Sequence, residues 1–143
     1  MPDAPAPNAP APDAAAPHVT PVQTRFGDTD ALGHLNNASY AVYAEVARLA
    51  FCETVGVDVS SLILARLEVD FRRQARFGEP VDVASWVERV GTTSVTMGQH
   101  VRASGAVAAE VRSVVVHFDY AAGRPAPWSD AARAALQAHV RAA

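Results

Sequence analysis

Residues 25–48 bring together side chains that could do chemistry. The segment RFGDTDALGHLNNASYAVYAEVAR has two carboxylates, a Gly-His pair and two adjacent asparagines directly before an alanine-rich run. A carboxylate can attack a carbonyl carbon or deprotonate a water molecule. The first turn of a helix offers unpaired N–H groups and a positive dipole end, which suit a developing oxyanion. Asp30 and a helix that starts near Asn37 would together supply both halves of an acyl-transfer site.

The same residue types also have a structural explanation. Asp, Asn and Gly are common before helices because they cap the first turn and form tight turns. On these grounds Asp28 is interpreted as structural, and Asp30 remains open between capping and catalysis. Asn37 is the expected N-cap, and Gly33 is expected to let the backbone bend closely.

Hydrophobic periodicity predicts two helices. Apolar residues recur at spacings of three and four over residues 37–55, which predicts one long helix that ends at Gly56. A second, shorter helix is predicted over residues 129–140, with Ser129 as its cap. The long helix directly follows the polar segment and would fix its position.

Period-two alternation predicts the strands. A short edge strand with Val22, Thr24 and Phe26 on one face precedes the long helix, and the apolar set of the last strand changes face near Val114, which suggests a bulge. One helix cannot cover both faces of such a sheet, so we expect a curved sheet that wraps the helix, and a second copy against its edges. The predicted strands span residues 18–26, 63–72, 81–90, 92–103 and 106–120.

Composition limits the class of protein. The 143 residues, half of them hydrophobic, suit one domain over residues 18–143 behind a Pro- and Ala-rich tail over 1–17, which we expect to be disordered. The net charge of −3 argues against nucleic acid as the main partner. The single cysteine, Cys52, cannot form an internal disulfide, and no apolar run approaches the roughly 20 residues of a membrane span. No secretory leader is recognisable, so we expect a cytoplasmic protein with no membrane partner.

Two segments carry a resemblance to a known family. FGDTDALGHLNNASYAVYAEVAR, followed one strand later by FRRQARFGEPVDV, resembles the hotdog-fold thioesterases of the 4-hydroxybenzoyl-CoA thioesterase type, which include the YbgC-like acyl-CoA thioesterases. The likeness extends over about residues 19–125. It implies an α+β hotdog fold, with a long central helix wrapped by a curved antiparallel sheet. It also implies hydrolysis of a thioester, usually of coenzyme A, at a site shared within a homodimer or a dimer of dimers.

The resemblance suggests roles for individual residues. Asp30 takes the position of the catalytic carboxylate, as base or nucleophile, and Asn37 that of the residue whose backbone N–H polarises the thioester carbonyl. His34 stands where related thioesterases carry a histidine. Because Leu32 replaces the asparagine that accompanies that histidine, His34 is interpreted as positioning or substrate-lining, or as a neutral structural histidine.

Substrate-binding residues are expected on both sides of this segment. Gly33 and Tyr40 are expected to line the substrate site, although core packing explains Tyr40 equally well. Arg72 and Arg73 are expected to hold coenzyme A phosphates, since basic residues near subunit borders do so in the family, although solvated surface charge is the commoner explanation. Coenzyme A is part of the substrate, so no separate cofactor is expected. The five histidines lack metal-ligand spacing, so no metal site is expected either.

Three alternatives stay open. Glu45 lies where another branch of hotdog thioesterases carries its carboxylate, although a pair with Arg48 one helical turn away is the preferred explanation. A non-catalytic hotdog module that binds acyl-CoA without cleaving it is a second alternative. A hotdog dehydratase is a third, but GHLNN differs from the histidine motif of such enzymes.

Overall fold

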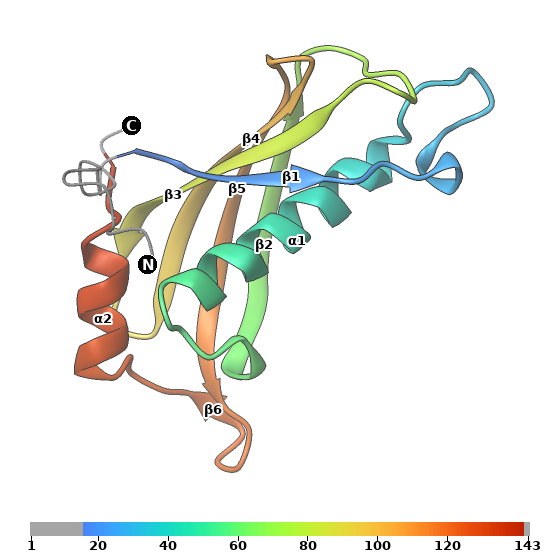
Figure 1. Ribbon diagram of the computed structural model, residues 1–143. Helices are drawn as coiled ribbons and strands as arrows, with labels where there is room; N and C mark the ends of the chain where they lie inside the picture. The colour runs from blue at the N-terminus through green and yellow to red at the C-terminus, as the bar shows by residue number, and fades with distance from the viewer. Residues whose placement is uncertain (1–15, 142–143) are drawn as a thin grey trace, which may run out of the picture.

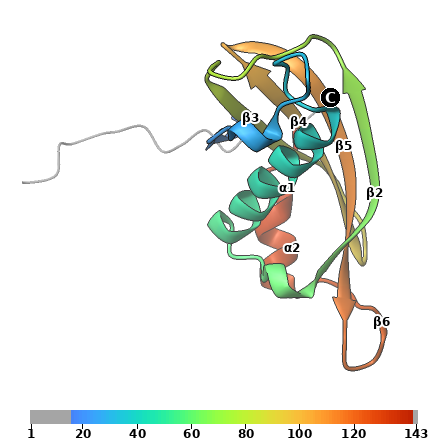
Figure 2. The same ribbon diagram turned by 90° about the vertical axis from the view of Figure 1, so that its right-hand side faces the viewer.

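The computed structural model describes residues 16–141. An antiparallel sheet curls around one long helix, α1 (Asn37–Thr54), and a short helix, α2 (Asp130–Gln137), packs beside β3 (Figures 1 and 2). The strands lie in the order β1-β3-β4-β5-β2, and β6 pairs with β5. Two short 3₁₀ turns complete the elements, η1 (Phe26–Asp28) and η2 (Val59–Ser61). The strands are β1 (His18–Val22), β2 (Leu62–Phe71), β3 (Val81–Val90), β4 (Ser94–Ala103), β5 (Ala106–Asp119) and β6 (Arg124–Pro125).

The concave face of the sheet buries one side of α1. Tyr40, Tyr43, Ala44, Ala47 and Phe51 are all at most 3% exposed, at the three- and four-residue spacings of one helix face. The alanines let the helix lie close to the strands. The buried alternate residues of β3, β4 and β5 meet this face, so the core is one layer of side chains between helix and sheet.

The strands form largely where alternation predicts them. The pairing register shows where the alternation of side chains is interrupted. The hairpin between β4 and β5 turns at Ser104 and Gly105, both with positive φ, which suits a tight hairpin turn. The irregularity expected near Val114 involves the neighbouring strand: the register of β2 shifts between Leu64 and Arg66, opposite Val115 and Val114.

Two expectations need correction or fall outside the described part. The first strand ends at Val22 rather than at residue 26, because Phe26 begins η1 and is 80% exposed. The tail predicted over residues 1–17 lies, apart from 16 and 17, outside the described residues. Within 16–141, neither helix combines the length and apolarity of a membrane span.

The segment between β1 and α1 is the part of the fold that positions the polar groups. After Val22 the chain leaves the edge of the sheet, forms η1 and turns back onto the first turn of α1. The segment 72–80, between β2 and β3, lies against it, since Leu35 N donates to Ala75 O at 2.7 Å. The start of α1 is therefore enclosed by two chain segments that are far apart in sequence.

Candidate active site

Asp30 is held by its own turn. Its Oδ1 accepts the N–H groups of Leu32 at 2.8 Å and His34 at 3.1 Å, and its N–H donates to His34 O at 2.8 Å. Gly33 has φ of 77°, so the turn uses a left-handed residue where the sequence predicts a close bend. Oδ2 of Asp30 has no hydrogen-bond partner among residues 16–141, and the side chain is exposed. One carboxylate oxygen thus fixes the group and the other is available.

The first turn of α1 supplies an unpaired donor. The N-cap is Asn36, whose side chain accepts from Ala38 N at 3.0 Å, so the expectation of Asn37 as N-cap was wrong by one residue. Adjacent asparagines are equally able to cap, so sequence alone does not choose between them. As the first helical residue, Asn37 keeps an N–H that donates to no acceptor in the described part of the chain.

A pocket of about 340 Å³ brings these groups together at the tip of α1. Six of the seven predicted site residues line it, and Gly33 instead lies in the turn between Asp30 and His34. Three lining residues were not predicted, Leu35, Phe71 and Gln74, because nothing in their local spacing distinguishes them from packing residues. The predicted residues that line the pocket are Asp30, His34, Asn37, Tyr40, Arg72 and Arg73.

An aromatic pair forms the apolar side of the pocket. Tyr40 is 2% exposed and meets Phe71 edge to face, with ring centroids 5.5 Å apart. Burial raises the pKa of the Tyr40 hydroxyl, opposed by the backbone of Ala75 and the charge of Arg73, so the phenol is neutral at physiological pH. This wall suits the apolar part of a ligand rather than a charge.

The two predicted phosphate ligands line the pocket but already have partners. Arg72 Nη2 pairs with Glu110 at 2.7 Å, and both side chains are about half exposed. Arg73 donates to Ala103 O at 2.7 Å and to Glu79 at 2.8 Å. An exposed ion pair contributes only about 0–1 kcal/mol, so Arg72 could exchange Glu110 for a phosphate, whereas Arg73 is held on two sides.

His34 lines the pocket and is half-buried. Its Nδ1 is buried without a hydrogen-bond partner within residues 16–141, and its backbone bridges to Arg76. The ring therefore has an unused polar atom beside the pocket, which fits a positioning or substrate-lining role better than a fully satisfied structural one.

Glu45 stands apart from these groups. It is exposed on α1 and does not line the pocket at the helix tip. The pair with Arg48 offered as its structural explanation does not form within the described residues: Arg48 is 5% exposed and its Nη1 has no partner. Burial lowers the pKa of the Arg48 guanidinium.

Cys52 is buried, and burial raises the pKa of its thiol to about 11, so it is an inert core residue.

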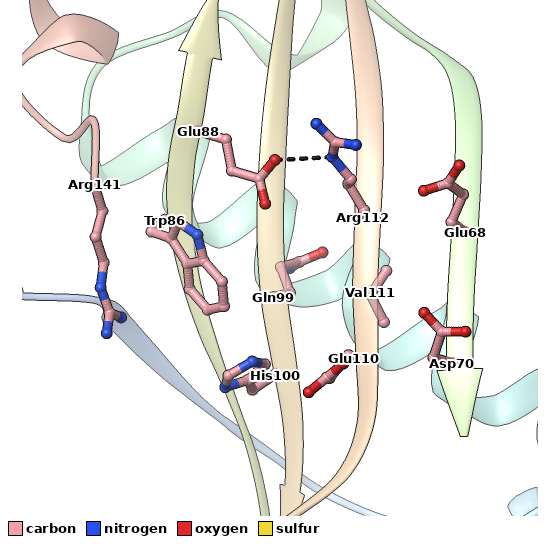
Figure 3. A pocket seen from close by; sticks show the side chains of 10 residues that line it. All are labelled: Glu68, Asp70, Trp86, Glu88, Gln99, His100, Glu110, Val111, Arg112 and Arg141. Atoms are coloured by element: carbon pink, nitrogen blue, oxygen red, sulfur yellow. Dashed lines mark hydrogen bonds and ion pairs between the residues drawn. The ribbon is translucent and has the colours of Figure 1, made fainter. Parts of the chain in front are cut away.

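A larger hollow of about 510 Å³ lies on the opposite face of the sheet (Figure 3). The indole of Trp86 lies there between His100, at 4.8 Å between ring centroids, and the guanidinium of Arg141, at 5.2 Å from the ring centre. Its Glu88 is paired with Arg112 at 2.8 Å. None of the predicted site residues lines this hollow.

Among residues 16–141 no group of three or more His, Cys, Asp or Glu is placed to hold a metal ion.

Comparison with known proteins identifies the family. Residues 24–136 match the model of the Thioesterase-like superfamily. The chain belongs to that superfamily. The match includes the whole pocket and every strand except β1.

Solved structures agree with this assignment to the Thioesterase-like superfamily. A thioesterase from Thermus thermophilus, complexed with coenzyme A and Zn, is 35% identical, with a TM-score of 0.80 over 87% of this chain and 94% of that one. A predicted thioesterase from Bacillus stearothermophilus is 33% identical, with a TM-score of 0.81 over 87% and 97%. The protein YsmA of Bacillus subtilis, uncharacterised, is 24% identical over 76% of this chain and 78% of its own length. The fold is therefore the hotdog fold that the resemblance implies.

Proposed function

We propose that this protein is an acyl-CoA thioesterase, which hydrolyses a thioester to a carboxylic acid and free coenzyme A. The observation that carries the proposal is that Asp30 and Asn37 line the same pocket, with Oδ2 of Asp30 and the N–H of Asn37 unpaired among residues 16–141. Membership of the Thioesterase-like superfamily supports the thioester as substrate, and the coenzyme A complex of the relative from Thermus thermophilus supports coenzyme A as the thiol carrier.

In the proposed reaction the thioester carbonyl oxygen accepts the N–H of Asn37. Negative charge that develops on this oxygen is stabilised by that donor and by the positive end of α1. Asp30 either deprotonates a water molecule that adds to the carbonyl carbon, or attacks that carbon itself to give an anhydride that water then opens. In both routes the carbon–sulfur bond breaks, the thiolate leaves and one water molecule is consumed. The water oxygen enters the product acid when water adds to the acyl carbon, and enters the regenerated Asp30 carboxylate when water adds to the aspartyl carbon of the anhydride.

The remaining lining residues suit the two ends of such a substrate. The Tyr40–Phe71 wall offers apolar contact for the acyl group next to the reacting carbon. Arg72, which lines the pocket and is half-exposed, can bind a phosphate of coenzyme A in exchange for Glu110. His34 lines the pocket and positions the thioester rather than acting as the base.

We also infer that the working form is a homodimer or a dimer of dimers. Within residues 16–141, strand β2 pairs only with β5, so its other edge is free there, and its Leu64 and Leu67 are 44% and 37% exposed. On α1, Val42 and Val46 are 46% and 49% exposed. A free strand edge beside exposed apolar side chains is the usual sign of a partner surface.

A panel of short, medium, long and aromatic acyl-CoAs, with released thiol measured by a chromogenic reagent, tests the proposal. We expect turnover of at least one member, and we expect Asp30→Asn to lower kcat by about 10²–10⁴-fold, the range for a lost general base. Glu45→Gln is the matched control, because it removes a carboxylate from the same region outside the pocket and should leave kcat unchanged.

Two results would contradict the proposal in different ways. If no acyl-CoA releases thiol but several bind, the protein is an acyl-CoA-binding module. If Asp30→Asn stays active while Glu45→Gln is inactive, the carboxylate on α1 carries the reaction. Circular dichroism and thermal melting of both variants show whether an activity loss reflects unfolding.

A further inference from the structure

Asp28 is the other carboxylate of the D-x-D segment, and it has a defined place outside the pocket. It is 6% exposed and lies two residues before Asp30, but it is absent from the pocket lining. A buried carboxylate is unfavourable unless it is paired, so its contacts should explain why the fold retains it.

The carboxylate of Asp28 links the loop to the middle of α1. Oδ2 accepts the hydroxyl of Tyr43 at 2.8 Å and the N–H of Arg25 at 3.0 Å, and Oδ1 accepts Nη2 of Arg25 at 2.9 Å. Burial alone would raise the pKa of Asp28, but these hydrogen bonds outweigh it and the pKa lies below its usual value. The group is therefore an anion, and Tyr43, itself 3% exposed, is its donor from the helix.

The backbone of Asp28 binds the start of the same helix. Its carbonyl oxygen accepts the N–H of Asn36 at 2.7 Å and the hydroxyl of Ser39 at 2.9 Å. The N–H of the N-cap residue is thereby used, and the first free donor of α1 is that of Asn37. One residue thus fixes the loop to the helix through both its side chain and its main chain.

Only one residue separates this connection from Asp30. Thr29 pairs with Leu35 in an antiparallel bridge, and the N–H of Asp30 then donates to His34 O at 2.8 Å. A shift of Asp28 relative to α1 must therefore move Asp30 relative to the N–H of Asn37. The separation of these two groups decides whether a carbonyl bound at Asn37 is within reach of the carboxylate.

We propose that Asp28 and Tyr43 form a positioning pair that sets the distance and angle between Asp30 and the oxyanion donor at Asn37. The pair touches no substrate and acts through the loop. This inference rests on the proposed thioesterase function, and it assigns to Asp28 a role in turnover beyond capping.

Tyr43→Phe is the sharpest test, because it removes one hydroxyl and keeps the buried ring. We expect kcat to fall by about 10–10²-fold with KM within about twofold, since small misplacements of reacting groups have effects of this size. Asp28→Asn should give a similar fall. The double variant should lose no more than the larger single loss, because both changes act on the same contact between the loop and α1.

Asp82→Asn is the matched control. It breaks an ion pair with Arg102 between β3 and β4, away from the pocket, and should leave kcat unchanged. Each variant is also melted, so that the fraction folded at the assay temperature is known. The proposal is overturned if kcat of Tyr43→Phe and Asp28→Asn equals that of the wild type, or if kcat falls only in proportion to the folded fraction.

Amide hydrogen exchange gives a readout that does not depend on turnover. The N–H groups of Leu32 and His34 are protected by Asp30, and that of Asn36 by Asp28. In Tyr43→Phe we expect faster exchange at these three amides and unchanged exchange in β4. If the wild-type protein cleaves no thioester, the proposed function fails but this measurement still decides the positioning: unchanged exchange at all three amides would refute it.

Discussion

At the scale of single residues, two aspartates separated by one residue, Asp28 and Asp30, have opposite environments. Both side-chain oxygens of Asp28 are occupied and the group is buried. Asp30 is exposed, with one oxygen held by backbone N–H groups and the other free beside the pocket. A carboxylate that reacts must keep an oxygen available, whereas one that positions the chain must use both. The environments therefore separate the two roles that the sequence pattern D-x-D leaves mixed.

A substitution at Asn37 tests the proposed oxyanion donor directly. Asn37→Pro removes the N–H and suits the first helical position, where proline is favoured. The preceding Asn36 has φ −63° and ψ 141°, the extended conformation that a following proline requires. We expect kcat to fall by about 10²–10³-fold in the thiol-release assay, the effect of losing one oxyanion donor.

Asn37→Ala is the control for this experiment. It keeps the N–H and removes only the side chain, so we expect kcat within a few-fold of wild type. Equal losses in the two variants would place the contribution of Asn37 in its amide side chain instead. A circular dichroism spectrum with unchanged helix content confirms that the proline leaves α1 intact.

At the scale of elements, the sequence predicts much of the fold because each element has one clear period. The helix predicted over 37–55 is observed as Asn37–Thr54, and the strand predicted over 81–90 is observed as Val81–Val90. The prediction that the first strand extends to Phe26 was wrong, because three alternating residues cannot distinguish a strand from an extended segment that leads into a turn. The extra residue at the β2–β5 register shift depends on pairing between distant segments, which local patterns do not contain.

The part of the site that lies close together in the sequence was predictable, as the single elements were. Asp30, His34 and Asn37 lie within eight residues and form the tip of one helix, so their proximity follows from local structure. The partners of Arg72 and Arg73 do not follow from local structure, because Glu110 lies on β5 and Ala103 is the last residue of β4. Whether a cation is free to bind phosphate is decided by these contacts between strands distant in sequence.

Gly98 of β4 shows how one element depends on another. A Cβ at this position would lie 2.5 Å from the indole of Trp86 on β3. The indole is confined by His100 and Arg141, so it cannot move away freely. We expect Gly98→Ala to reduce the free energy of unfolding by about 1–3 kcal/mol, as overpacking does, measured by urea denaturation.

Gly27→Ala is the comparison for this change. Gly27 has no atom within 4 Å of an added Cβ and no positive φ, so its substitution should change stability by less than about 0.5 kcal/mol. An unaltered unfolding midpoint for Gly98→Ala would mean that Trp86 rearranges without loss, and that the contacts of Arg141 and His100 with the ring contribute little.

At the scale of the whole molecule, the edge strand β2 has one unpaired side within residues 16–141. This strand exposes Leu64 and Leu67, and α1 exposes Val42 and Val46. Phe71, the end of β2, is 50% exposed and also lines the pocket, so the free edge and the proposed active site are continuous. A second copy against this edge would bury part of the pocket wall, which connects assembly to activity.

Substitution of the exposed apolar residues tests this connection. We expect the wild-type protein to be a dimer or tetramer by light scattering, and Leu67→Lys on β2 to shift it toward monomer, because a stable interface buries roughly 800 Å² per partner and excludes unpaired charge. Leu67 is 37% exposed, so the folded monomer tolerates the lysine. Thiol release should fall together with the dimer fraction. Tyr120→Lys, in the turn after β5, should alter neither, and a fully active monomeric Leu67→Lys would show that each copy carries a complete site.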